Sequence, residues 1–328
     1  MCLLGGLVRS VMLGPFVQLR VAISTPGGMM PTAQGPAGPR RRLGVELRQL
    51  RRRAGLQLVE VAQELDCSAS KISRLENGKG IPRMPDVVAL MELYSVSDDG
   101  RRERLTQLVH ESREQGWWER YTDGVQAERF VMNSPARYTA LETEAVRVSS
   151  FEVMWVHGLL QVPDYTRAVL AELLSRTTDD QVEKLVELRL RRQEALTRRV
   201  PPLELVVVLD ESVLSRVVGS PDVMAAQMRH LRERSELSNV TIRVLPFTVG
   251  LHRAHAGPFQ ILEFPDQAGS DVVFVEGPSG DTYENESDVD MYKDVLADVA
   301  DRALGPDASR EIVHRYELQH APPGGRPR

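Results

Sequence analysis

Residues 56–79 hold two short amphipathic segments separated by a turn, and this pair limits the fold of the chain more than any other feature. In both segments the apolar residues recur at helical spacing. Ser68 is a good N-cap for the second helix, and Asn77-Gly78 is a typical helix end. The inward positions of the pair are Val61, Ala62, Leu65, Ile72 and Leu75. The segment therefore predicts two packed helices, with one face of the second left uncovered.

The uncovered face of the second helix has the residue types of a DNA-reading surface. Ile72 and Leu75 turn inward, which leaves the other side chains of the helix pointing outward. The outward residues are Ser68, Ala69, Ser70, Ser73 and Arg74. A helix presented in this way fits the major groove, where side chains read base edges. An arginine fork on guanine contributes ~1–3 kcal/mol, so Arg74 is the main candidate for sequence readout. The alternative is a plain helical hairpin with a solvated basic face.

The string from Lys71 to Lys79 is Lys-Ile-Ser-Arg-Leu-Glu-Asn-Gly-Lys. Together with the turn and helix before it, this string resembles the helix-turn-helix of the Xre family, relatives of the lambdoid phage repressors. The resemblance covers residues 40 to about 96 and implies an all-α, lambda-repressor-like domain of five helices that binds double-stranded DNA. The fifth helix is expected from Asp98 to Gln115. The base-facing positions that the resemblance implies are Ser68, Ala69, Ser70 and Arg74.

The resemblance also implies residues that support the reading helix. The positions near the phosphates are Lys71, Asn77 and Lys79. Arg51 and Glu76 match a buried ion pair that braces the motif in relatives. Leu58 stands where the family often has a polar residue that bonds a phosphate. Two interpretations stay open: Gln57, one residue earlier, substitutes for it, or the contact is missing.

The charge distribution places nucleic-acid binding at the N-terminal end. Residues 40–79 contain ten Lys and Arg against five Asp and Glu, whereas the whole chain has a net charge of −5. Residues 80–328 are therefore strongly acidic. Basic surfaces attract polyanions through counterion release and acidic ones do not. We therefore expect only the N-terminal unit to bind nucleic acid.

Composition divides the chain into five parts. Residues 1–39, interrupted by Gly and Pro, are predicted to be a disordered tail. Within it, Met1–Ser24 lacks the features of a signal peptide, and Met29 or Met30 is an alternative start. The following parts are the helix-turn-helix domain (40–96), a connecting helix with an aromatic linker (97–139), a larger domain (140–318) and a second tail (319–328).

Residues 140–318 mix strand and helix patterns, which favours a mixed α/β domain and an α+β class for the whole chain. The predicted strands are 151–155, 203–209, 240–245, 259–264, 272–276 and 281–283. The predicted helices are 163–174, 179–199, 221–236, 287–304 and 308–318. Residues 117–140 are expected to be irregular.

The larger domain resembles the antitoxin-like domain that follows such a motif in many actinobacterial regulators. The segments that carry the resemblance are 157–168, 189–196, Pro246, 250–252, 259–264 and 275–276. The resemblance implies a regulatory or interaction domain that acts with a small partner protein encoded nearby.

No motif for catalysis or metal binding stands out, so we expect no enzyme, no cofactor and no metal site. Cys2 and Cys67 are too few for a disulfide framework or a cysteine-rich zinc site, and they favour a cytoplasmic setting. His252 and His255 lack a third ligand at an evident spacing. The sequence contains neither a nucleophile elbow nor a phosphate-binding glycine loop. No stretch is long and apolar enough to cross a bilayer, so no membrane contact is expected.

Three further features have a structural and a functional interpretation. The arginine run 189–199 is either a second nucleic-acid surface or a solvated helix face, and its interspersed glutamates favour the second. Trp117, Trp118 and Tyr121 either pack between domains, the commoner case, or line a pocket for a small effector. His157, beside a strand end, is expected to be a structural histidine.

Two functional hypotheses follow. The first is a sequence-specific, DNA-binding regulator of transcription, a homodimer on a palindromic operator, whose larger domain senses a signal or binds a partner. The alternative is an antitoxin-like interaction module that binds a small partner protein and regulates its own level. A third class, an enzyme with a DNA-binding arm, has no motif to support it.

Overall fold

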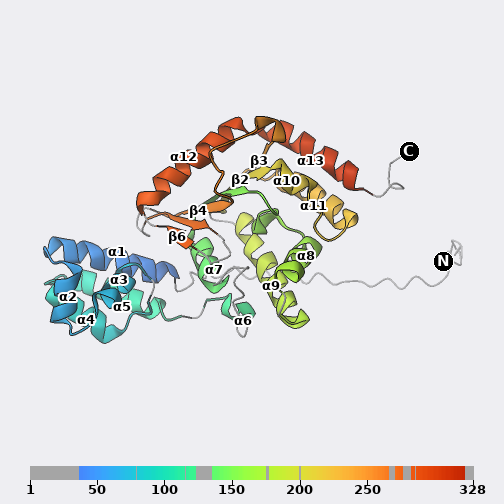
Figure 1. Cartoon of the computed structure of the whole chain (residues 1–328). Coiled ribbons are helices and arrows are strands. Elements are labelled where there is room, and N and C mark those ends of the chain that lie inside the picture. The colour runs from blue at the N-terminus through green and yellow to red at the C-terminus, as the bar shows by residue number, and fades with distance from the viewer. Residues whose placement is uncertain are drawn as a thin grey trace, which may run out of the picture. The chain divides into compact units, whose positions relative to one another are not determined.

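The computed structural model describes residues 37–78, 80–114, 116–122, 135–174, 177–198, 201–265, 270–275, 282–284 and 286–321. A helical domain comes first and a mixed sheet with helices follows (Figure 1), which confirms the α+β class. Residues 1–36 and 322–328, which hold most of the two predicted tails, lie outside this set. No helix among the described residues is both long and apolar enough to span a membrane.

The helical domain packs α1 to α5 around one apolar core. The helices are α1 (Ala37–Arg53), α2 (Leu58–Glu64), α3 (Ala69–Glu76), α4 (Met84–Leu93) and α5 (Asp99–Glu111). Leu43, Leu47 and Leu50 of α1 form the centre of this core. Ile72 and Leu75 of α3 join the same core, so α3 packs on the longest helix of the domain.

Both ends of the helical domain extend beyond the predicted bounds of 40–96. α1 begins at Ala37, with Gly38 and Pro39 in its first turn. Proline fits there because the N–H groups of a first turn have no partner within the helix. α5 contributes Leu105, Leu108 and Val109 to the core. The helix predicted as a connection is therefore part of the helical domain.

The segment predicted to be irregular contains two helices among its described residues, α6 (Glu119–Thr122) and α7 (Pro135–Glu144). The predicted boundary at residue 140 therefore cuts through α7. Tyr138, Leu141 and Ala145 are buried at helical spacing, and Pro135 stands in the first turn, where proline is favoured. These positions are the signal by which the helix is recognisable in the sequence.

Trp117, Trp118 and Tyr121 pack against helices of the larger domain. They form an apolar cluster with α8 (Pro163–Leu173) and α9 (Asp179–Gln193). Trp117 meets Trp118 edge to face, with ring centroids 5.9 Å apart. The arrangement agrees with packing, the commoner of the two interpretations of these aromatic residues.

The larger domain is built on a mixed sheet, in which six strands among the described residues follow the order β3-β2-β1-β4-β5-β6. The strands are β1 (Arg147–Glu152), β2 (Glu204–Asp210), β3 (Val240–Leu245), β4 (Phe259–Glu263), β5 (Val272–Val275) and β6 (Thr282–Glu284). β1 and β3 run parallel to β2, whereas β4 runs antiparallel to β1 and to β5, and β6 antiparallel to β5.

The central strand β1 begins at Arg147, earlier than the predicted start at residue 151. Ser149 and Ser150 are buried within it, because helices cover both faces of the sheet. A strand buried on both faces lacks the alternation of polar and apolar residues by which strands are found. The prediction was therefore wrong about where this strand starts.

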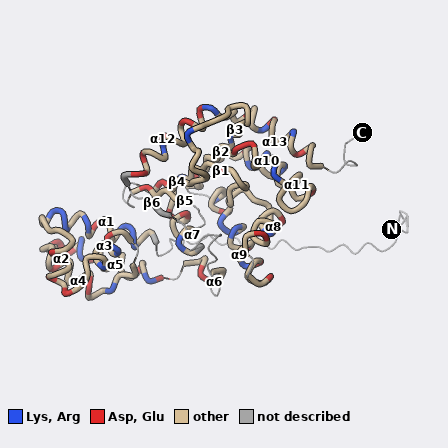
Figure 2. The backbone as a smooth tube through the Cα atoms, in the orientation of Figure 1, with Lys and Arg blue, Asp and Glu red and all other residues tan. Residues whose placement is uncertain are grey.

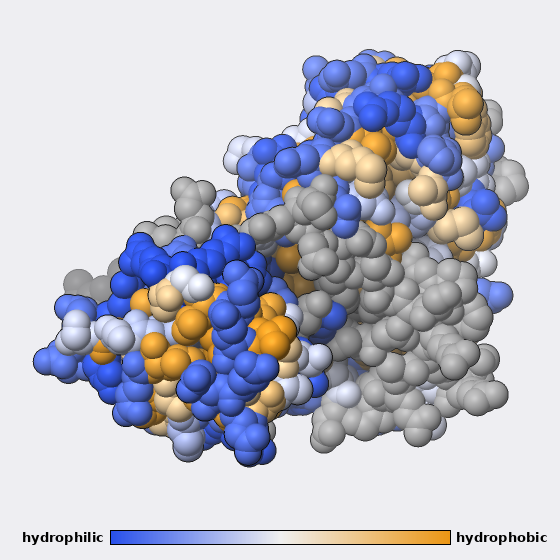
Figure 3. All heavy atoms as spheres, turned by 60° about the vertical axis from the view of Figure 1, so that its left-hand side comes forward, coloured by the Kyte–Doolittle hydropathy of each residue, from blue (hydrophilic) through white to orange (hydrophobic). Residues whose placement is uncertain are grey.

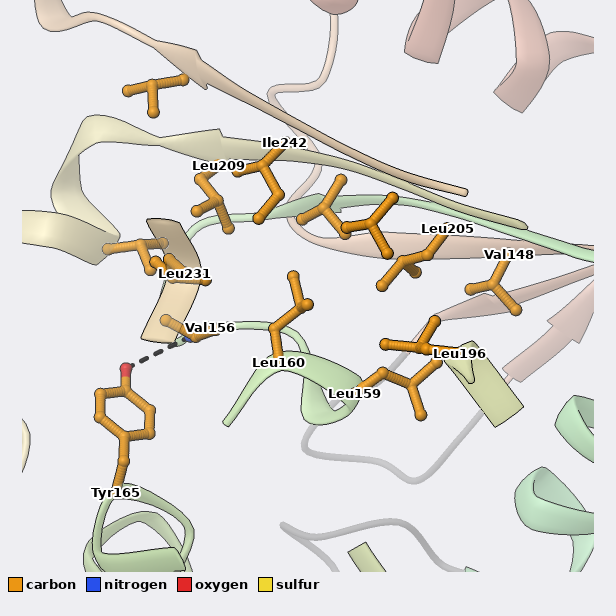
Figure 4. Close-up of a cluster of buried hydrophobic side chains, with 14 of the residues drawn as sticks. Val148, Val156, Leu159, Leu160, Tyr165, Leu196, Leu205, Leu209, Leu231 and Ile242 are labelled. Atoms are coloured by element: carbon orange, nitrogen blue, oxygen red, sulfur yellow. Dashed lines mark hydrogen bonds between the residues drawn. The ribbon is translucent and has the colours of Figure 1, made fainter. Parts of the chain in front are cut away.

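Helices cover the sheet on two sides. The remaining helices are α10 (Glu211–Ser215), α11 (Pro221–Arg234), α12 (Glu286–Arg302) and α13 (Pro306–His320). α8, α11 and α13 pack on one face, where Figure 4 shows Leu205 and Ile242 of the strands turned toward Leu160. α12 packs on the other face, around Phe151 and Val208.

Three arginines of the run 189–199 bond to residues of the domain, which corrects the prediction of a solvated face at their positions, whereas Arg191 is exposed and pairs with Glu194 as that prediction expects. Arg192 is 6% exposed and donates two hydrogen bonds of 2.7 Å to the carboxylate of Glu142 on α7. Arg189 Nη1 donates to Gln161 Oε1 at 2.8 Å, and Arg198 donates to the backbone carbonyls of Thr143 and Ala145 at the C-terminal end of α7. Guanidinium groups enter a core in this way because their planar fork matches carboxylate and carbonyl oxygens.

His157 is a buried structural histidine, 1% exposed. Its Nδ1 accepts a hydrogen bond from the N–H of Leu159 at 3.2 Å. The neutral ring therefore carries its proton on Nε2, which donates to Gln260 Oε1 at 3.4 Å. Burial lowers the pKa of His157 to about 4. Glu142, Arg192 and Arg189 are the charged groups around the ring.

We expect the free energy of unfolding to fall as the pH falls from 6.5 toward 4. The pKa of His157 is about 4 in the folded chain against an ordinary 6.5, so the unfolded chain takes up the proton first. The contribution is fully present above pH 6.5 and is lost toward pH 4, and it corresponds to ~3 kcal/mol. Urea unfolding across this pH range measures it.

The control is His157→Asn, which keeps an acceptor for the Leu159 N–H and does not titrate. Other groups titrate in both proteins, so the difference between them isolates the histidine. If stability fell equally in the two proteins, the burial of a neutral His157 would not be the cause.

Candidate nucleic-acid interface

α2 and α3 form the helix pair expected at residues 56–79, joined by a tight turn. Ser68 caps α3, since its Oγ accepts from the backbone N–H of Lys71 at 3.2 Å. In the turn, Asp66 has φ of 45°, and the N–H of Cys67 donates to the carbonyl of Ala62 at 2.9 Å. The cap and the turn together fix the direction in which α3 leaves α2.

One side of α3 is buried and the opposite side is accessible. Ile72 and Leu75 are buried in the core. Ser68, Ser70, Lys71, Arg74 and Asn77 are exposed, and Ala69 and Ser73 are partly exposed. The α3 face is the name used below for Ala69, Ser70, Ser73, Arg74 and Asn77, which helical spacing places on one side. Lys79 lies outside the described residues.

Arg74 is the long side chain of the α3 face. It is exposed, and no hydrogen bond or ion pair joins it to another residue in the described part of the chain. A guanidinium in this situation keeps all of its donors for a ligand. The other residues of the α3 face are short, so Arg74 projects furthest from the helix.

The ion pair implied by the resemblance is present between Arg51 of α1 and Glu76 of α3. Arg51 Nε lies 2.7 Å from Glu76 Oε1, and Nη2 lies 2.9 Å from Oε2. Arg51 Nη1 also donates to the carbonyl of Leu56 at 2.9 Å. The hydrogen bonds from Arg51 to Glu76 raise the pKa of the guanidinium. This pair ties the C-terminal end of α3 to α1 and to the start of α2.

Gly44 allows α1 and α3 to approach closely, a role that the sequence analysis missed. A Cβ atom added at Gly44 would lie 2.4 Å from the backbone oxygen of Glu76. Gly78, with φ of +63°, passes close to Arg41 of α1 in the same region. The signal in the sequence is a glycine in the middle of the leucine-spaced helix α1, where glycine is otherwise unfavourable.

Two of the residues expected near the phosphates have partners within the domain. The ammonium of Lys71 lies 2.8 Å from Asp86 Oδ1 on α4, so its charge is already paired. Asn77 Nδ2 donates to Ser73 Oγ at 3.3 Å, and Asn77 Oδ1 accepts from Arg48 of α1. Arg48 was missed by the sequence analysis because the contact joins helices far apart in the sequence.

Gln57 and Leu58 differ in what they offer a phosphate. Leu58 is apolar and half-buried against the helical core, so its side chain cannot bond a phosphate. Gln57 is exposed at the N-terminus of α2, and its backbone N–H donates to Glu60 Oε2 at 2.6 Å. The side chain of Gln57 is therefore accessible, beside a carboxylate that caps the helix.

Positive charge gathers at the C-terminal end of α1. Its last turn carries Arg51, Arg52 and Arg53, and the latter two are exposed. Figure 2 shows the basic residues of α1 in blue. In the space-filling view, hydrophilic side chains cover much of the helical domain, with apolar ones between them (Figure 3). Because Arg51 contacts α3, this charge lies near the C-terminal end of the α3 face.

The described residues contain no group of three or more His, Cys, Asp or Glu side chains that could hold a metal ion. His252 and His255 follow the loop after β3, where His255 Nδ1 lies 3.0 Å from the carbonyl oxygen of Arg253. His252 instead meets the ring of Phe151 edge to face. The two imidazoles therefore have different local partners.

Comparison with known families divides the chain in the same way. A family model described as a helix-turn-helix domain matches residues 42–105, and one described as a domain of unknown function, DUF5753, matches residues 135–315. No curated protein and no solved structure matches the chain. The first match indicates DNA binding and regulation of transcription. The second covers more than half of the chain.

Removing one partner of the buried ion pair is expected to destabilise the helical domain more than removing both. Glu76→Ala leaves the Arg51 guanidinium without its carboxylate, at a cost of ~3–5 kcal/mol in the free energy of unfolding. Arg51→Met combined with Glu76→Leu fills the site with apolar groups and is expected to cost less. Urea unfolding followed by circular dichroism measures both. A double variant less stable than Glu76→Ala would contradict this account.

Proposed function

The chain belongs to the family of the DUF5753 domain, a domain of unknown function, and on that premise we propose that it is a sequence-specific regulator of transcription of the Xre type. In this proposal the helix-turn-helix domain places α3 in the major groove of double-stranded DNA. The match of residues 42–105 to a helix-turn-helix family supports DNA binding, and the geometry of the α3 face supports the mode of binding.

The observation that carries the proposal is the accessible α3 face with Arg74 projecting from it. The opposite side of α3 is buried, so the helix is held while its outer face stays accessible. Short side chains such as those of Ser70 and Ser73 let the helix backbone approach the base edges. Arg74 has the reach and the paired donors to bind O6 and N7 of guanine.

Contacts to the DNA backbone come from α1 and from the end of α3. Arg48 of α1 donates to Asn77 at the C-terminal end of the α3 face, and Arg52 and Arg53 are exposed one turn further along α1. Lys71 contributes less, because its ammonium already pairs with a carboxylate of α4. Such contacts fix the position of the domain on the duplex without reading its sequence.

The size of α3 supports a dimer. The helix has eight residues, and at 1.5 Å per residue it is ~12 Å long, so one copy reads only a few base pairs. Tight and specific binding then needs two copies, presented ~34 Å apart on the duplex. The proposal therefore includes a homodimer on a palindromic operator.

The larger domain supplies the regulation in this proposal. It senses a signal or binds a partner, a small protein encoded nearby being the partner class that the family resemblance implies. The proposal assigns no enzymatic reaction, cofactor or metal to the chain. Ligand or partner binding acts by changing the affinity of the dimer for its operator.

Arg74→Ala is expected to weaken binding to the operator and to relax its sequence preference. The loss of an arginine fork on guanine costs ~1–3 kcal/mol, which is about 5-fold to 150-fold in affinity. Affinity for unrelated DNA changes much less. Mobility shift assays at one salt concentration measure this, with the operator found by selection from random duplexes or in the DNA upstream of the gene.

The matched control is Arg104→Ala, which removes the same charge from α5. Arg104 pairs with Glu46 at 3.0 Å and does not belong to the α3 face. If Arg74→Ala bound the operator as tightly as the wild type, the assigned readout would be wrong. An equal loss in both variants would mean that charge alone matters.

The operator is expected to contain two inverted half-sites, with centres about one helical turn or a multiple of it apart. Two chains bind each duplex, and a single half-site binds far more weakly. Analytical ultracentrifugation of the complex gives the stoichiometry, and footprinting gives the spacing. One chain bound tightly to one half-site would overturn the dimer.

A further inference from the structure

Lys71 lies in the first turn of α3, and a carboxylate of the next helix holds it there. Its ammonium lies 2.8 Å from Asp86 Oδ1, and Asp86 belongs to the first turn of α4. The side chain of Lys71 is 47% exposed and that of Asp86 28%, so solvent reaches both groups. Arg74 stands three residues after Lys71, so the two side chains are neighbours on the surface of α3. The ion pair therefore lies beside the α3 face.

The pair of Lys71 and Asp86 contributes little to the stability of the helical domain. An exposed ion pair is screened by solvent, and ordering the two side chains offsets most of its attraction. Asp86 has a separate structural role, since the helix dipole favours a negative charge in the first turn of α4. That role needs the carboxylate but not Lys71. The contact with Lys71 therefore has its consequence elsewhere, at the α3 face.

The α2–α3 pair carries little positive charge for a surface proposed to meet DNA. Residues 58–77 contain four acidic residues and two basic ones, Lys71 and Arg74. Arg74 has no partner among the described residues, whereas Lys71 has Asp86. To contact a phosphate, the ammonium has to leave this carboxylate or share its charge with it. In both cases most of the attraction between Lys71 and the phosphate is offset.

From this arrangement we propose that Asp86 is a positioning residue that lowers the affinity of the helix-turn-helix domain for DNA of any sequence. It acts through Lys71, because it holds the ammonium and offsets its charge. Phosphate contacts carry the sequence-independent part of the affinity, whereas base contacts carry the sequence preference. Arg74 then sets which sequence is bound, and Asp86 sets how tightly any sequence is bound. This inference rests on the proposed function, since it takes α3 to enter the groove.

The experiment measures the affinity of the full chain for the operator and for a duplex of unrelated sequence, over a range of salt concentrations. Asp86→Asn removes the carboxylate charge at nearly constant shape. We expect the affinity per chain to rise by about the same factor on both duplexes, ~fivefold or more at ~0.1 M salt. The slope of log affinity against log salt concentration is expected to steepen by ~0.9 for each chain bound, which is one additional phosphate contact. An unchanged slope overturns the proposal.

Two further variants test whether Asp86 acts through Lys71. In a Lys71→Met background, Asp86→Asn is expected to change the affinity and the slope much less than it does in the wild type. An equal gain in both backgrounds means that the carboxylate repels DNA by itself, and this result overturns the assignment. Asp86→Glu restores the carboxylate and is expected to bind DNA with the wild-type slope. A slope as steep as that of Asp86→Asn would contradict the role of the charge.

The matched control is Asp99→Asn, which removes a carboxylate from the first turn of α5. Asp99 is exposed, so the control loses the same charge at the same kind of helix position. We expect its salt slope to equal that of the wild type. Equal steepening in Asp99→Asn and Asp86→Asn would mean that net charge alone sets the affinity, and it would refute the role of Asp86. Circular dichroism checks that each variant is folded.

Binding by the wild type separates this inference from the function on which it rests. A wild type that binds neither duplex refutes the proposed function. A wild type that binds DNA, with no steeper slope in Asp86→Asn, refutes only the role of Asp86.

Discussion

Guanidinium groups buried against carboxylates hold both domains in the arrangement described. Arg51 joins α1 to α3 through Glu76, and Arg192 joins α9 to α7 through Glu142. Each guanidinium donates two hydrogen bonds to its carboxylate. A buried guanidinium is stable only while its donors are bonded, so each pair constrains two helices to a narrow range of positions.

The position of α3 in the helix-turn-helix domain depends on the first of these pairs. α3 has only eight residues, so its position comes from contacts with α1 and α2. The Arg51–Glu76 pair and the Gly44 contact act at the C-terminal end of α3, and the Ser68 cap acts at its N-terminal end. A helix held in this way does not have to become ordered when it binds a partner, which lowers the cost of binding. In the larger domain, the Arg192–Glu142 pair lies next to His157 and Tyr138, which both donate to Gln260 Oε1.

Much of the fold and of the candidate interface can be read from local patterns. The α2–α3 pair, the cap at Ser68 and the outward position of Arg74 follow from periodicity within a few residues. The start of β1 does not, because Ser149 and Ser150 become buried only when other elements cover them. The helix α7 has a local signal in Tyr138, Leu141 and Ala145, but its polar residues Thr139 and Glu142 become buried only in the folded domain. In the sequence, the arginine run 189–199 resembles a solvent-exposed surface, because arginine is rarely buried without a partner. Glu142, the partner of Arg192, lies on another helix. Two contacts join separate helices, Lys71 with Asp86 and Arg48 with Asn77. No pattern within one segment of the sequence predicts them.

The sequence by itself determined the helix-turn-helix, the face of α3 that points outward and the basic character of the N-terminal unit, because each depends on neighbouring residues. Only the tertiary structure decided which charges remain available. A charged side chain is less available to a ligand when a partner from another element comes within hydrogen-bond distance. Lys71 and Arg192 have such partners, whereas Arg74 has none among the described residues.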